Sequence, residues 1–150
     1  MRKLMAIFLA ACCMIFVSCG REKAFEGKVN TLDGVSMTVL QDTVTSRTMT
    51  LQILNTTDQE IYCGNDAVYE LQAERWGKWY QVESGPYGYF LEAYVCQKNV
   101  PLEQYINLEK RYGALPAGRY RIIKEVSIGS GDTRQAFLLA AEFDMEERRK

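Results

Sequence analysis

Apolar and polar residues alternate along much of the chain between positions 35 and 143. Around residue 51, for example, apolar positions are separated by Thr48, Thr50 and Gln52. A two-residue period predicts half-buried strands, because successive side chains of a strand point to opposite faces. The apolar positions are Val35, Met37, Val39; Met49, Leu51, Ile53; Tyr69, Leu71, Ala73; Tyr120, Ile122; and Phe137, Leu139, Ala141, Phe143. The pattern therefore predicts an all-β fold.

Turn-forming residues separate these segments at 55–60, 74–79, 83–88 and 129–132. Gly77 is expected at the tip of a hairpin, because glycine suits the tight turns that join paired strands. The segment 102–113 also has apolar positions that would suit a helix, and we expect a strand in its first half and a turn in its second. This spacing predicts a small antiparallel β-sandwich of about seven to eight strands.

The first twenty residues have the features of an export signal. Arg2 and Lys3 precede an uncharged apolar run at 4–17, which is shorter than the ~20 residues that cross a bilayer. A positive start, a short apolar run and then small residues are typical of a secretory signal. The segment ends at Ser18 and Cys19.

The stretch 16–19 resembles the lipobox of bacterial lipoproteins, in which a small residue precedes the lipidated cysteine. Ser18 and Cys19 match, whereas Phe16 stands where leucine is usual. The resemblance implies that Cys19 becomes the lipidated N-terminus, with acyl chains such as palmitate that each contribute about 0.8 kcal/mol per buried methylene. The alternative is an ordinary signal in which Cys19 has no role.

These observations divide the chain into four parts. We expect a lipoprotein signal peptide at 1–18, the lipidated Cys19 with a short tether at 19–28, the sandwich at 29–145 and a charged tail at 146–150. The implied location is the cell membrane or envelope of a bacterium, to which the exported protein would be anchored by lipid.

The stretch YGALPAGRYRIIKEV, at 112–126, is the most specific motif. It resembles the closing motif of a family of bacterial immunoglobulin-like domains, in which a Tyr-Gly-x-Leu-Pro-x-Gly turn leads into a Tyr-Arg-Ile strand. The segments LQILNTTDQEIYCG and YELQAERWGKWYQV resemble that family's second strand and following hairpin. The family usually has a Pro-Gly turn after AYVC, whereas this chain has Pro101 without glycine. The resemblance covers about 35–143 and implies an immunoglobulin-like β-sandwich. The matching residues are Tyr112, Gly113, Leu115, Pro116, Gly118, Tyr120, Arg121 and Ile122.

The motif residues also have a structural interpretation. Pro116 fixes φ and opens a turn, and Gly118 permits a conformation with positive φ. Tyr120 then occupies the position of a tyrosine corner, whose hydroxyl bonds the upstream backbone while its ring fills the core. Ile122 stands where antibody domains carry a cysteine, so we expect apolar packing there.

Cys63 and Cys96 are the cysteines that remain after the signal and the anchor. Two cysteines in an exported domain suggest one disulfide. They follow the strand-like segments EIY and AYV, and we expect them just beyond strand ends. The alternative is two free, partly buried thiols, and two cysteines alone do not suggest a metal site.

Aromatic residues gather between 76 and 94 and include four candidate binding residues: Trp76, Trp79, Tyr80 and Tyr87. Exposed aromatic rings stack on sugars or anchor protein interfaces. Trp76, at the hairpin tip, is the best candidate for exposure. The alternative is that alternate rings fill the core and the others cover the hairpin.

Composition excludes several function classes. The chain has no histidine, which excludes Ser-His and Cys-His dyads and zinc sites with imidazole ligands. Its net charge of −1, without a basic run, gives no footprint for nucleic acid. We therefore expect no catalytic residues, metal or cofactor. The sequence predicts a membrane-anchored, non-catalytic binding or accessory module at the cell surface with a protein partner. The alternative is a lipoprotein that binds a small ligand or carbohydrate through the hairpin at 76–80.

Overall fold

The computed structural model describes residues 23–88 and 92–146. The expected signal peptide, Cys19 and most of the charged tail lie outside the described residues. Within them the chain forms nine strands, one short helix and two 3-10 turns. These elements are β1 (Val35–Leu40), η1 (Gln41–Thr43), β2 (Thr48–Asn55), β3 (Ile61–Gly64), β4 (Glu70–Arg75), β5 (Lys78–Gln81), β6 (Ala93–Cys96), β7 (Leu102–Asn107), α1 (Glu109–Tyr112), β8 (Gly118–Ile128), η2 (Gly131–Thr133) and β9 (Gln135–Met145).

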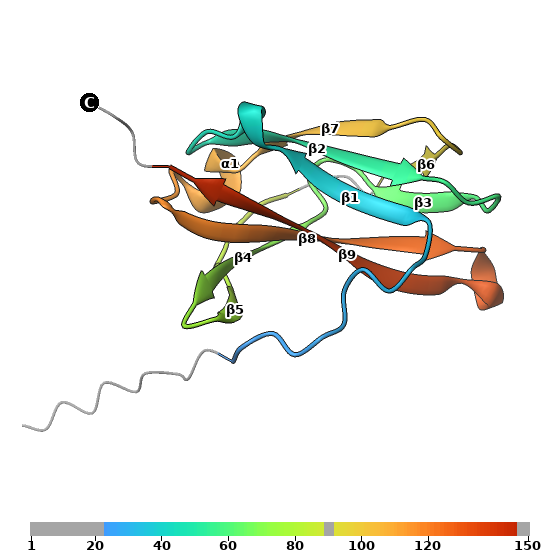
Figure 1. The fold of residues 1–150 in the computed structure, drawn as a ribbon, viewed down its shortest axis with the longest axis horizontal. Coiled ribbons are helices and arrows are strands. Elements are labelled where there is room, and N and C mark those ends of the chain that lie inside the picture. Colours follow the sequence, from blue (N-terminus) through green and yellow to red (C-terminus); the bar gives the residue numbers. More distant parts are fainter. Residues whose placement is uncertain (1–22, 89–91, 147–150) are drawn as a thin grey trace, which may run out of the picture.

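The strands form two antiparallel sheets that pack as layers (Figure 1). The smaller sheet has the order β1-β2-β7. The larger sheet has the order β5-β4-β8-β3-β6, and β9 pairs with the other edge of β8. The predicted all-β antiparallel sandwich is confirmed. The strand number exceeds the expected seven to eight because β3, β5 and β6, of four residues each, are separate short strands.

Alternation along the strands fills the space between the sheets. In β2, Met49, Leu51 and Ile53 are fully buried, while the residues between them are partly exposed. β9 contributes Leu139, Ala141 and Phe143 from the opposite sheet. The segment 102–113 forms β7 and then the single turn of α1, as its two halves suggested.

Strand β8 is shared by two partners on one of its edges. Residues 120–123 pair with β4 and residues 126–128 pair with β3, while β9 follows the other edge along the whole strand. Lys124 stands between the two pairings and, by alternation, on the same face as the core residues Ile122 and Val126. Its side chain is only 1% exposed. Its Nζ donates to Asn65 O and Val68 O, each at 2.7 Å. Lys124 thus satisfies carbonyls of the β3–β4 loop where the ladder is interrupted.

The motif at 112–122 packs as scaffold. Tyr120 is 5% exposed, its hydroxyl donates to Pro116 O at 3.0 Å, and its ring stacks on Phe143. This is the hydrogen bond expected of a tyrosine corner. Ile122 is fully buried.

Two glycines of this motif differ in conformation from each other. Gly118 does not adopt the positive φ that glycine permits, and the positive value is found at Gly113, with φ 69°. Gly118 begins β8 opposite Met145 and is therefore extended. Gly113 follows the last turn of α1 and donates its N–H to Glu109 O, which is where glycine commonly ends a helix.

Primary amides close the free edge of β9. The Asn30 side chain donates to Ala140 O and accepts from Ala140 N. Gln41 bonds the backbone of Asp144 in the same two ways. These contacts occupy backbone groups that an edge strand would otherwise present to another chain.

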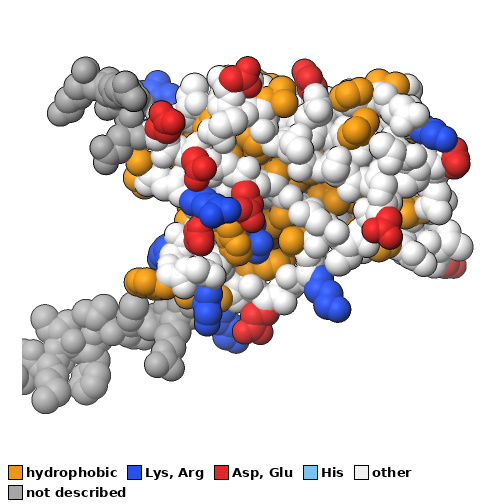
Figure 2. All heavy atoms as spheres, viewed as in Figure 1, with side chains coloured by type: hydrophobic (Ala, Val, Ile, Leu, Met, Phe, Trp, Pro, Cys, Tyr) orange, Lys and Arg blue, Asp and Glu red, His pale blue; other side chains and the backbone are white. Residues whose placement is uncertain are grey.

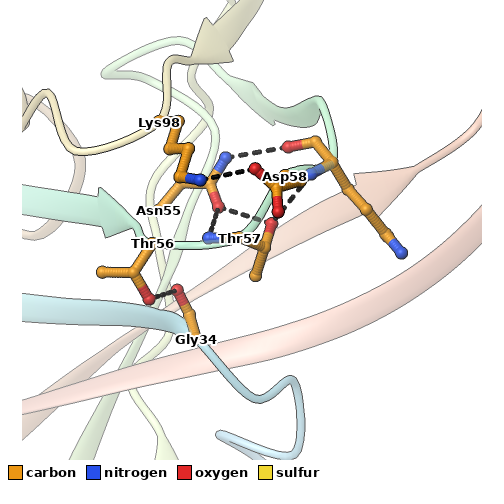
Figure 3. A network of polar contacts seen from close by, with 7 residues as sticks. Gly34, Asn55, Thr56, Thr57, Asp58 and Lys98 are labelled. Atoms are coloured by element: carbon orange, nitrogen blue, oxygen red, sulfur yellow. Dashed lines mark hydrogen bonds and ion pairs between the residues drawn. The ribbon is translucent and has the colours of Figure 1, made fainter.

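Asn55, the last residue of β2, joins the two sheets (Figure 3). This fully buried residue donates from Nδ2 to Gln59 O and Cys96 O, both at 2.9 Å. Its Oδ1 accepts from the backbone N–H and the hydroxyl of Thr57. Lys98 pairs with Asp58 beside it. A single side chain from β2 therefore holds both a turn and the end of β6.

Lys124 predicts a specific pH dependence of stability. Burial lowers the pKa of Lys124 from 10.5 to about 8. Between pH 8 and 10.5 the unfolded chain binds more protons at this position than the folded chain, so the free energy of unfolding should rise with pH. Relative to Lys124→Met, the wild type should gain roughly 3 kcal/mol across that window. Urea unfolding from pH 7 to 11 measures the free energy of unfolding of the wild type and of Lys124→Met. In both proteins Cys63 and Cys96 are replaced by alanine. Parallel curves would contradict the prediction.

Candidate binding surfaces

The hairpin of β4 and β5 ends in a two-residue turn formed by Trp76 and Gly77. Arg75 and Lys78 pair across the strand ends, and the turn residues have φ values of 53° and 72°. Two positive φ values define the tight turn that matches strand twist. Gly77 adopts this conformation without strain, whereas a non-glycine residue in the left-handed region costs about 1–2 kcal/mol. Trp76 is therefore held in a strained conformation at the tip.

Trp76 extends into solvent and is 87% exposed. Its ring meets Tyr80 edge-on, with centroids 6.3 Å apart and planes at 89°. The guanidinium of Arg75 lies over the same Tyr80 ring at 5.6 Å. Lys78 is exposed nearby, and Figure 2 shows basic side chains around this part of the molecule. The tip is thus an exposed indole with basic neighbours.

Trp79 points to the other face of the hairpin. Arg121 places its guanidinium over both the Trp79 ring, at 4.6 Å, and the Phe25 ring, at 4.9 Å. Its Nε also donates to Gln72 Oε1 at 2.7 Å. Burial lowers the pKa of Arg121. Trp79 is therefore a packing partner of this arginine and is separate from the exposed tip.

The N-terminal segment docks on the hairpin at β5. Ala24 forms an isolated antiparallel bridge with Tyr80, and Phe25 N donates to Trp79 O at 2.8 Å. The expected tether at 19–28 is therefore attached to the domain at residues 24 and 25. Sequence alternation gave no sign of this contact, because a single bridge has no period.

Tyr87 lies in a separate cluster. The Arg111 guanidinium is 5.9 Å from the Tyr87 ring and closer to the rings of Tyr69 and Tyr112. Arg111 also donates to Tyr69 O at 2.5 Å. Of the four aromatic candidates, the structure brings Trp76 and Tyr80 together at the tip. Trp76 is exposed and Trp79 and Tyr80 are half-buried, so none of these three rings is a core residue. Their strands project beyond the smaller sheet (Figure 1). The alternative that alternate rings of the stretch fill the core also concerns residues 89 and 90, which lie outside the described residues.

Four further exposed apolar side chains lie on β6, on β7 and on the loop between them, and we call this stretch of chain the β6–β7 edge. In the described ranges, five large apolar side chains are exposed, and apart from Trp76 all belong to this edge. They are Tyr94, Val95, Val100 and Tyr105, with exposures from 39% to 60%. β6 and β7 are edge strands of different sheets. Sequence reasoning missed this surface because the alternation of short edge strands does not show which face is covered.

Cys63 and Cys96 are free thiols in neighbouring strands. The expectation that they follow strand ends is wrong: Cys63 lies inside β3 and Cys96 is the last residue of β6. Both are buried, and Cys96 Sγ is 3.7 Å from Cys63 Sγ. The hydrogen bond from Cys96, with a smaller contribution from Lys124, lowers the pKa of Cys63, and the same bond raises the pKa of Cys96. Cys63 is therefore the thiol that ionises first.

Among the residues that the structure describes, no three His, Cys, Asp or Glu side chains gather as a metal-binding group. In the same part of the chain, no helix has the length and hydropathy needed to cross a membrane.

The comparisons with known proteins agree with the fold. The family model described as Bacterial Ig-like domain matches residues 31–144. The chain therefore belongs to the bacterial Ig-like domain family. Comparison with curated proteins gave no match, and comparison with solved structures gave none either. Membership supports a non-catalytic accessory or binding module and names no partner.

The thiol pair predicts a disulfide under oxidising conditions. The two sulfur atoms need move only from 3.7 Å to bonding distance of about 2 Å. Closing the 63–96 loop should stabilise the domain by roughly 3–4 kcal/mol. Thiol titration of the denatured, oxidised protein, in a variant with alanine at Cys12, Cys13 and Cys19, should detect almost no thiol, and reductant should restore the two at Cys63 and Cys96. Two titratable thiols after oxidation would contradict the prediction.

Proposed function

We propose that this protein is a bacterial lipoprotein, anchored through Cys19, whose Ig-like domain binds a protein partner at the cell surface through the β6–β7 edge. The domain acts as a non-catalytic accessory module that is held close to the membrane. The lipid anchor inserts into the bilayer, and one protein binds at the β6–β7 edge.

The exposed apolar side chains of β6, β7 and the loop between them carry this proposal. Four of the five exposed large apolar residues in the described ranges lie between residues 94 and 105. They are close in the sequence, and exposed apolar side chains of this kind are candidates for contacts with a protein partner. Edge strands also offer unpaired backbone groups, so a partner could add a strand there.

The hairpin and β6 lie at opposite ends of the larger sheet, and this separation supports the proposed anchored arrangement. β4 pairs with the first half of β8 and carries the hairpin, whereas β3 and β6 adjoin its last residues. The N-terminal segment docks at Tyr80 of the hairpin. A lipid anchor at Cys19 would therefore hold the hairpin end near the bilayer and leave Tyr94 and Val95 farther away.

A carbohydrate-binding role for the hairpin is less favoured by the geometry. Sugar rings stack on a broad aromatic face, and two aromatic residues extend that face when their rings are coplanar. The Trp76 and Tyr80 rings are perpendicular, at 89°. Trp79 and Tyr87 belong to other clusters, so the four candidates do not form one platform.

The anchor is tested by labelling cells with radioactive palmitate. The wild-type protein should carry the label and sediment with membranes. Cys19→Ala should lose both properties, because the thioether to the diacylglyceryl group cannot form. Cys63→Ala, which removes a buried thiol of the domain, is the matched control and should keep the label. Label that persists in Cys19→Ala would contradict the anchor.

The binding surface is tested by recovery of a cross-linked partner from detergent-solubilised membranes. A Val95→Glu, Val100→Glu double variant places two charges in the β6–β7 edge and should weaken partner affinity at least tenfold, or about 1.4 kcal/mol. Thr38→Glu adds a charge at an exposed position of β1 and should leave recovery unchanged. Equal recovery with the double variant and the wild type would exclude this edge as the binding surface.

A further inference from the structure

We infer that the β4–β5 hairpin is a second membrane contact, with Trp76 placed in the headgroup region of an anionic bilayer beside the lipid anchor. This inference rests on the proposed lipidation of Cys19. The exposed indole of Trp76 contacts lipid, whereas the β6–β7 edge binds the protein partner.

The number of residues between Cys19 and Ala24 limits the distance between the lipid anchor and the hairpin tip. Cys19 lies five residues before Ala24, and Ala24 pairs with Tyr80. Five extended residues span at most about 18 Å. The ring of Tyr80 is 6.3 Å from the ring of Trp76. The tip is therefore within reach of a bilayer surface to which Cys19 is bound.

The chemistry of the tip suits a bilayer interface. Trp is enriched at the membrane–water boundary, where an amphipathic ring lies at headgroup level. Arg75 and Lys78 flank the turn, and Glu74, the acidic residue next to Arg75 in the sequence, pairs with Arg119 at 3.6 Å. Basic side chains beside an apolar one favour anionic lipids.

The backbone at the tip adds a further observation. Trp76 occupies a positive φ that suits glycine or asparagine, yet its side chain is 87% exposed. Neither turn geometry nor burial accounts for a bulky indole at this position. A strained residue with an exposed apolar side chain is characteristic of a contact made outside the domain.

Tryptophan fluorescence tests the inference because the described residues contain the chain's two tryptophans, 76 and 79. The full lipidated protein is reconstituted in vesicles of phosphatidylglycerol and phosphatidylcholine whose acyl chains carry bromine near the headgroup. In Trp79→Phe, emission from Trp76 should fall by at least half relative to unbrominated vesicles. In Trp76→Phe, emission from Trp79, which packs against Arg121, should change much less.

A charge variant tests the preference for anionic lipid. Arg75→Gln with Lys78→Gln, in the Trp79→Phe background, should reduce the quenching of Trp76 at least threefold. Lys110→Gln removes an exposed charge on α1 and should leave it unchanged. Thermal unfolding checks that each variant is folded.

The outcomes separate this inference from the proposed anchor. Palmitate on Cys19 with no quenching of Trp76 would overturn the inference and leave the anchor standing. Absence of palmitate would overturn both. A Trp76 that is unquenched by lipid but cross-links to a protein, or shifts its emission with oligosaccharide, would overturn the membrane assignment in favour of that occupant.

Discussion

The shared edge of β8 is the constraint on which the rest of this sandwich depends. The strand runs for eleven residues, and no single neighbour on that edge is as long. β4 and β3 divide it, and the loop between them has carbonyls that point at the break. A buried polar group is costly unless it is bonded. Lys124 supplies two donors at this point, and this accounts for a lysine on the face of β8 that also carries the core residues Ile122 and Val126.

The division of one edge of β8 between β4 and β3 also separates the β4–β5 hairpin from the β6–β7 edge. Because β4 and β3 lie end to end along β8, the strands that extend from them, β5 and β6, are found at opposite ends of the larger sheet. The hairpin then receives the N-terminal segment, while β6 is held to the smaller sheet by Asn55. The same break in pairing that requires Lys124 thus gives the domain one end that contacts its N-terminal segment and another end far from that segment.

Sequence periodicity predicted what depends on alternation and missed what depends on distant pairing. The buried positions Met49, Leu51 and Ile53 and the corner formed by Tyr120 follow from local pattern and from the family resemblance. Lys124 could not be predicted as buried, since a charged residue in a strand ordinarily lies on the solvent-exposed face of the sheet. The docking of Ala24 on Tyr80 involves residues 56 positions apart with no repeated pattern, and the exposure of Val95 depends on which sheet edge remains uncovered.

An anchored domain gains orientation from a second, weak contact. A lipidated cysteine followed by a few residues fixes distance to the bilayer but leaves the domain free to rotate about the attachment. A contact at Trp76 would become an intramolecular event, in which the effective concentration of bilayer surface is high because the linker is short. Even a single indole with two basic neighbours would then bias the domain toward one orientation. In that orientation Tyr94 and Val95, which lie at the other end of the larger sheet, would face away from the membrane and toward a partner.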